Sequence, residues 1–156
     1  MVSMARLVEE IKMTKPFSLL EEEATLSIVR TADVLHQRAA EFLRPFDISP
    51  SQYNVLRILR GAKEPLGCGQ IAGRMVSRDP DITRLLDRME ARGLLSRARD
   101  ALDRRVVKAQ ITNKGLRLLD QIAPLLTEHH QTQFAGFGEK KLRQLVGWME
   151  AVRSAI

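Results

Sequence analysis

The clearest hydrophobic pattern in the chain lies in residues 79–93. Its apolar residues recur at positions i, i+3, i+4 and i+7, which predicts one apolar stripe along a helix: Ile82, Leu85, Leu86 and Met89. We expect Asp79 to cap this helix, Pro80 to occupy its first position and Gly93 to end it in a left-handed conformation. The opposite side would carry Thr83, Arg84, Asp87, Arg88 and Ala91.

Two short apolar runs follow this helix, at residues 94–99 and 106–111. We predict that they pair as antiparallel strands. The segment between them, residues 100–105, is too long and too highly charged for a tight two-residue turn. A helix that leads directly into a hairpin with a basic tip is typical of a winged helix, so the pattern indicates a DNA-reading module.

Upstream of this unit, the pattern predicts a long helix and two shorter ones. Residues 18–21 have the order of a capping box, and the helix they open should end near Arg44, ahead of Pro45. Its apolar residues occupy more than one face, which indicates two packing partners. Residues 49–52 repeat the start signal for a second helix that ends at Gly61, and residues 66–75 predict a short third helix.

Downstream, Thr112 can cap a helix that includes Leu116 to Leu126, and residues 139–155 predict a terminal helix with one apolar stripe. We expect the terminal helix to pack on the first long helix and on a second copy of the chain. The predicted fold is mainly α with a small β-hairpin. A winged-helix region (47–111) lies between helical dimerisation segments (17–46 and 112–156), and residues 1–16 form an N-terminal arm.

The distribution of charge supports nucleic acid as the partner. The 156-residue chain has a formal net charge of +6, with 25 Lys and Arg against 19 Asp and Glu. Residues 66–117 hold twelve of the basic and six of the acidic residues, so the whole excess falls in this third of the chain. A local basic field favours association with a polyanion. The alternative is an ordinary solvated surface.

Other classes of function find little support in the sequence. There is no nucleophile–base set and no phosphate-binding glycine loop, so we expect no enzyme activity and no cofactor. His129 and His130 are adjacent and point about 100° apart on a helix, which disfavours a metal site. The single cysteine, Cys68, is interpreted as a small buried side chain. No apolar run is long enough for a membrane span, and we expect a cytoplasmic protein.

The motifs of this region resemble those of the MarR family of dimeric winged-helix transcription regulators. The resemblance is carried by Gln70-Ile71-Ala72, by residues 82–94, by Asp103-Arg104-Arg105 and by Ile111-Thr112-Asn113-Lys114-Gly115. The last two match the family's D-x-R wing and its L-T-x-x-G, with Ile in place of Leu. The resemblance covers residues 17–156. The sequence departs from the family at Gly67 and Gly69, where a Thr or Ser usually opens the short helix.

This resemblance implies roles for individual residues. The predicted recognition helix and the turn before it would contact bases and phosphates of double-stranded DNA through Ser77, Arg78, Thr83, Arg84 and Arg88. The wing would place Arg104 or Arg105 in the minor groove, and Asp103 would pair with an arginine to hold the loop. For Arg84 and Arg88 the alternative is salt bridging on the helix surface, since Arg84 and Asp87 are three residues apart.

The family likeness also implies a homodimer on a near-palindromic operator, with repression as the commoner mode. A small aromatic or phenolic effector would bind in a cleft between the winged helix and the dimer helices, and its binding would release the DNA. His36, Tyr53 and Arg57 are candidates to line this cleft, because they lie where the first two long helices should meet. Ordinary packing is the alternative for each of them. A rival interpretation of the whole chain is a winged helix used as a protein-interaction module.

Overall fold

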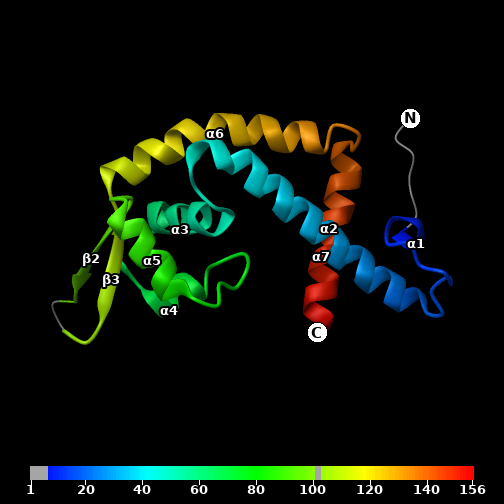
Figure 1. Ribbon diagram of the computed structural model, residues 1–156, viewed down its shortest axis with the longest axis horizontal. Coiled ribbons are helices and arrows are strands. Elements are labelled where there is room, and N and C mark those ends of the chain that lie inside the picture. The colour runs from blue at the N-terminus through cyan, green and yellow to red at the C-terminus, as the bar shows by residue number, and fades with distance from the viewer. Residues whose placement is uncertain (1–6, 101–102) are drawn as a thin grey trace.

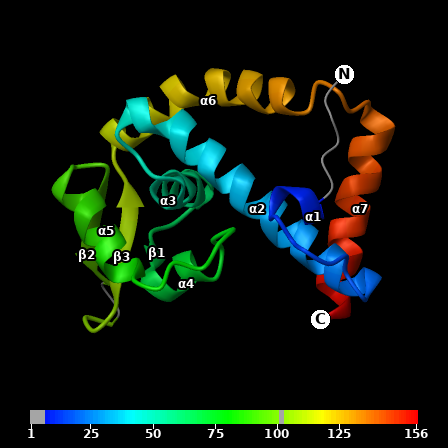
Figure 2. The ribbon, with the colours of Figure 1, turned by 45° about the vertical axis from the view of Figure 1, so that its right-hand side comes forward.

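In the computed structural model, which describes residues 7–100 and 103–156, the winged-helix region and the C-terminal helix lie at opposite ends of the molecule, and two other long helices run between these ends (Figure 1). The helices are α1 Leu7–Glu10, α2 Leu20–Leu43, η1 Arg44–Phe46, α3 Pro50–Gly61, α4 Cys68–Ala72, α5 Ile82–Ala91, α6 Asn113–Gln133 and α7 Glu139–Ala155. The strands are β1 Leu66–Gly67, β2 Leu95–Arg99 and β3 Val107–Ile111. Helix α6 spans the molecule along one side and links the sheet to α7 (Figures 1 and 2).

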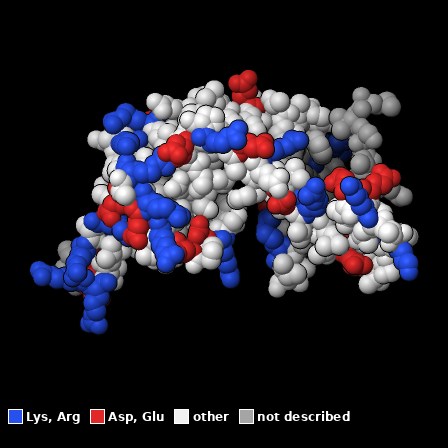
Figure 3. Space-filling model, viewed as in Figure 1, with Lys and Arg blue, Asp and Glu red and all other residues white. Residues whose placement is uncertain are grey.

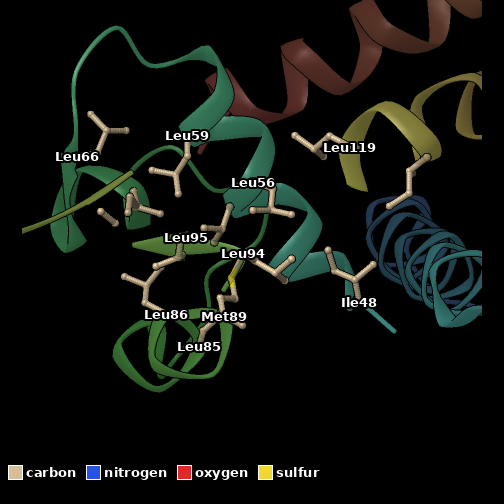
Figure 4. Close-up of a cluster of buried hydrophobic side chains, with 14 of the residues drawn as sticks. Ile48, Leu56, Leu59, Leu66, Leu85, Leu86, Met89, Leu94, Leu95 and Leu119 are labelled. Atoms are coloured by element: carbon tan, nitrogen blue, oxygen red, sulfur yellow. The ribbon is translucent and has the colours of Figure 1, made fainter. Parts of the chain in front are cut away.

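The core lies where α3, α5 and α6 meet the sheet. Leu85, Leu86 and Met89 of α5 point toward Leu95, the first residue of β2, and toward Leu94 just before it (Figure 4). The helical stripe expected from the sequence is therefore confirmed at these three positions, and Ile82 is half-buried beside them. Burial of each large aliphatic side chain stabilises the fold by roughly 1.5–3 kcal/mol.

The sheet has three antiparallel strands in the order β1-β3-β2, rather than the expected hairpin alone. Strands β2 and β3 pair from Leu95 with Ile111 to Arg99 with Val107, as their spacing predicts. Residues 66–75 do not form one helix, because Leu66 pairs with Ala109 across the sheet. Helix α4 therefore begins only at Cys68, and the side chain of Gln70 accepts a hydrogen bond of 2.9 Å from the N–H of Gly67.

The start of α5 differs from the expected one by two residues. Its N-cap is Asp81, which accepts a hydrogen bond of 3.2 Å from the N–H of Arg84. Asp79 instead accepts one from the N–H of Asp81, so it stabilises the turn that precedes the helix. The chain contains two aspartates two residues apart, and local sequence alone did not separate their roles. At the other end Gly93 is left-handed as predicted, with φ of +69°.

Of the helix caps predicted elsewhere in the chain, those of α3 and α6 are confirmed and that of α2 is wrong. Ser49 and Gln52 form the predicted capping box of α3, with bonds of 3.2 and 3.0 Å. Thr112 caps α6, as predicted, by accepting from the N–H of Gly115 at 3.2 Å. The capping box of residues 18–21 is wrong, since α2 begins at Leu20 and Ser18 lies one residue too early to cap it.

The long helices bury little within one chain. Helix α2 contributes only Leu43 to the core, and α7 contributes no residue. The buried residues of α6 all belong to its first half: Gly115, Leu119 and Ile122. Within the described residues, no helix combines the length and the apolar character needed to cross a bilayer.

Candidate nucleic-acid interface

The outward side of α5 is exposed along its whole length. Thr83, Arg84 and Arg88 lie on this side, opposite the buried stripe. The Nε atom of Arg84 is 3.2 Å from Asp81, yet its side chain is still 79% exposed. The alternative pairing of Arg84 with Asp87 does not form, because Asp87 pairs with Arg97 of β2 instead. The guanidinium of Arg84 is therefore held at the start of the helix and stays accessible to an anion.

Ser77 and Arg78 lie in residues 73–81, the segment between α4 and α5. Both side chains are exposed. The segment leads into the N-terminal end of α5 (Figure 2). In a helix-turn-helix, the residues near this end of the second helix contact base edges. The structure thus brings Ser77 and Arg78 to the same end of the helix as Thr83 and Arg84.

The loop between β2 and β3 is shaped by backbone bonds to two aspartates. The N–H of Asp103 donates to Asp100 at 3.1 Å, and the N–H of Arg105 donates to Asp103 at 3.0 Å. Asp103 also lies 3.7 Å from the Nε atom of Arg105, which is 95% exposed. Arg104 is exposed next to it. Both arginines therefore project from the tip of the wing, and the arginine beside Asp103 is Arg105.

Arg97 of β2 joins the sheet to α5. Its Nε atom donates to Glu90 at 2.9 Å, and its Nη2 atom donates to Asp87 at 2.5 Å. The hydrogen bond to Glu90, together with that to Asp87, raises the pKa of Arg97 above its ordinary value. No local pattern in the sequence predicts a role for Arg97, because its partners lie seven and ten residues away on another element.

Several basic residues of this region are paired with groups of the protein itself. Arg92 binds the carboxylate of Asp47 at 3.0 Å and also its carbonyl oxygen. Lys114 donates to the carbonyl oxygen of Arg92 at 2.7 Å. Lys108 pairs with Asp100, and this hydrogen bond raises the pKa of Lys108. Fewer of the basic residues in this region are therefore available to bind an anion than composition alone suggests.

Figure 3 shows the charged side chains on one face of the molecule. Lys and Arg side chains project from the wing, at the lower left of this view, whereas both signs of charge are mixed over the rest of the face. An arrangement of this kind favours the approach of a polyanion to the winged-helix end.

The three residues expected to line a ligand cleft do not line the pocket that the structure shows beside α5. His36 and Arg57 are exposed, and Tyr53 is half-buried against the core. None of them lines the pocket of about 770 Å³ between the end of α2, the start of α3 and α5. The charged side chains of that pocket are Glu41, Arg44, Asp47, Arg88 and Arg92.

Cys68 is half-buried at the first residue of α4, and its Sγ atom lies 4.0 Å from Oγ1 of Thr83.

The MarR family model matches residues 48–107. The chain is similar to a MarR transcription factor from Planctomyces limnophilus of known crystal structure, with 37% sequence identity and a TM-score of 0.66. The match covers 87% of this chain and 99% of that protein's chain. YsmB of Bacillus subtilis strain 168, an uncharacterized HTH-type transcriptional regulator, is 27% identical over 116 residues, 74% of this chain and 79% of its own. The crystal structure of the S. aureus MepR–DNA complex has a TM-score of 0.76 at 24% identity, covering 85% of this chain and 97% of its own. The chain belongs to the MarR family of DNA-binding transcription regulators.

Proposed function

We propose that the protein represses transcription as a homodimer that binds a near-palindromic operator. Helix α5 enters the major groove, and Thr83, Arg84 and Arg88 contact bases and phosphates there. The single observation that carries this proposal is the division of α5 into a buried apolar side and an exposed basic side. The fold shared with MepR, which was crystallised with DNA, supports the same docking.

The wing supplies a second contact. Arg104 and Arg105 are exposed at its tip and enter the adjacent minor groove, where an arginine reads groove width and negative potential rather than base identity. Arg97 fixes the position of the wing relative to α5 through Glu90 and Asp87, so both contacts are presented as one rigid surface. Ser77 and Arg78 extend this surface from the turn before α5.

Salt dependence of DNA binding tests this function. Duplexes enriched from a random library should bind with an affinity that falls steeply with salt, because each neutralised phosphate contributes about 0.9 to the slope of log K against log salt. Replacing Arg104 and Arg105 together with alanine should weaken binding about tenfold or more and reduce the slope. Arg143→Ala, on α7 and paired with Glu139, is the matched control and should leave both unchanged.

Failure of this experiment would favour the rival interpretation. If no duplex is enriched, or if the enriched and random duplexes bind equally with a shallow salt slope, the winged helix serves as a protein-interaction module.

An effector site is part of the same proposal. The pocket of about 770 Å³ has an apolar floor that includes Ala40, Ile48 and Pro50, while Arg44 and Arg88 can bind an acidic group. A small aromatic acid seated there would engage Arg88, which also lies on the DNA-reading side of α5. Such a ligand favours a DNA-free arrangement only if it binds that arrangement more tightly.

Release of DNA by 4-hydroxybenzoate tests the location of this site. Arg44→Ala should raise the concentration needed for release about tenfold, because a charge-assisted hydrogen bond contributes roughly 1.5–3 kcal/mol. His36→Ala, in α2 and outside the pocket, should not change this concentration. The opposite result would place the effector in the cleft expected from the sequence, beside His36, Tyr53 and Arg57.

A further inference from the structure

Val76 is an apolar side chain that the fold leaves almost fully in water. It is 89% exposed, in the segment between α4 and α5. Among the described residues of the winged-helix region, 47–111, the other large apolar side chains that are exposed are Val106 at 39% and Val107 at 45%. The remaining exposed apolar side chains belong to the arm and to the long helices and their connections. Val76 therefore stands apart from the apolar surface of the dimerisation segments.

The backbone at Val76 is fixed from a neighbouring helix. Its N–H donates to the Oδ1 atom of Asn54 in α3, at 2.8 Å. The preceding residue, Met75, packs against the core, and the next two residues, Ser77 and Arg78, are exposed. Because the N–H already has a partner within the protein, the side chain is what Val76 offers to a ligand. The tether to Asn54 and the anchor at Met75 hold this side chain outward.

The chemistry of the major groove identifies a matching group. Thymine places a C5-methyl group there, the one apolar substituent that the four base pairs present in that groove. Valine has a branched, stiff side chain, so little conformational freedom is lost when it packs against a methyl group. On the basis of the proposed function, we propose that Val76 is a specificity-determining residue that packs on the 5-methyl group of one thymine in each half-site. Asn54 is its positioning residue.

The test replaces thymine with deoxyuridine, which removes the methyl group and keeps base pairing. A duplex enriched from a random library by the full-length protein is the probe, and each thymine of a half-site is replaced in turn. Replacement of thymine at one position should weaken binding about fourfold per half-site. This is the equivalent of the ~0.8 kcal/mol gained by burying one methyl group. The other positions should have smaller effects.

Three variants assign the methyl contact to a residue. Val76→Ala should bind the thymine and deoxyuridine duplexes equally. The comparison is a double-mutant cycle in which the protein loses the valine side chain and the DNA loses the methyl group. Asn54→Ala should also lose the discrimination, while the salt dependence of binding stays unchanged, since no phosphate contact is removed. Val107→Ala, at an exposed valine on β3, is the matched control and should keep the full fourfold difference.

Two results would overturn the inference while the proposed function stands. In one, enriched duplexes bind but no thymine methyl group matters; in the other, Val76→Ala discriminates thymine from deoxyuridine as well as the wild type. If no duplex is enriched at all, the proposed function and this inference fail together.

Discussion

Replacing Gly115 with alanine is expected to lower the free energy of unfolding by about 3 kcal/mol, which is large for a single added methyl group. A Cβ atom at this position would lie 2.3 Å from the carbonyl oxygen of Leu94 and 2.9 Å from a side-chain carbon of Ile111. The first of these atoms is backbone and cannot rotate away. The first turn of α6 would have to move off the sheet, and urea denaturation measures the loss.

Gly147→Ala is the control for this prediction. Gly147 lies inside α7, and a Cβ atom there would meet nothing within 4 Å. Alanine removes conformational freedom from the unfolded chain, so this variant should be more stable than the wild type by roughly 0.5–1 kcal/mol. If Gly115→Ala were as stable as Gly147→Ala, the close approach of α6 to Leu94 would be wrong.

The same contact explains why a short motif in the sequence is informative. Thr112 accepts a hydrogen bond from the N–H of Gly115, and its Oγ1 atom donates to the carbonyl oxygen of Gly93 at 2.7 Å. Thr112 thus caps α6 and ties it to the end of the recognition helix, while Gly115 leaves room for the backbone at Leu94. The cap is local to four residues, which is why the T-x-x-G motif can be recognised in the sequence. The contacts with Gly93 and Leu94 join distant residues, and the motif alone does not reveal them.

Features that depend on distant parts of the chain were not predictable in this way. Strand β1 exists because Leu66 and Gly67 pair with Ala109 and Lys108, and a two-residue strand has no periodicity of its own. The bonds of Arg97 to α5 likewise depend on how the sheet packs. By contrast, the buried stripe of α5 follows from the period of 3.6 residues and was predicted correctly. The DNA contacts and the roles of His36, Tyr53 and Arg57 stay predictions.

The second large effect is expected at the apolar side of α7. Leu145 and Val152 are 38% and 42% exposed, lie seven residues apart on one side of the helix, and have no core of their own to join. The same helix exposes Val146 and Trp148. Helix α2 likewise exposes Leu26 and Val29, so both long helices present apolar surface that a second copy of the chain would cover.

Replacing Leu145 and Val152 together with aspartate should dissociate the proposed dimer. Each buried aspartate would place an unpaired charge in an apolar interface, which costs several kcal/mol. A monomer holds one half-site at a time, so the affinity for a duplex with two half-sites should fall by about 10²–10⁴ through loss of the linked second contact. Analytical ultracentrifugation measures the first effect, and titration of an enriched duplex measures the second.

The control places two aspartates on the other side of the same helix, at Lys140 and Ser154, both of which are exposed. At about 100° per residue these positions lie roughly opposite Leu145 and Val152. This variant should stay dimeric and should keep the wild-type affinity for a duplex with two half-sites, apart from a weak effect of charge. Two results would show that α7 does not form the interface. In one, the wild-type protein sediments as a monomer at every concentration. In the other, the Leu145→Asp/Val152→Asp variant binds a duplex with two half-sites as tightly as the wild type does.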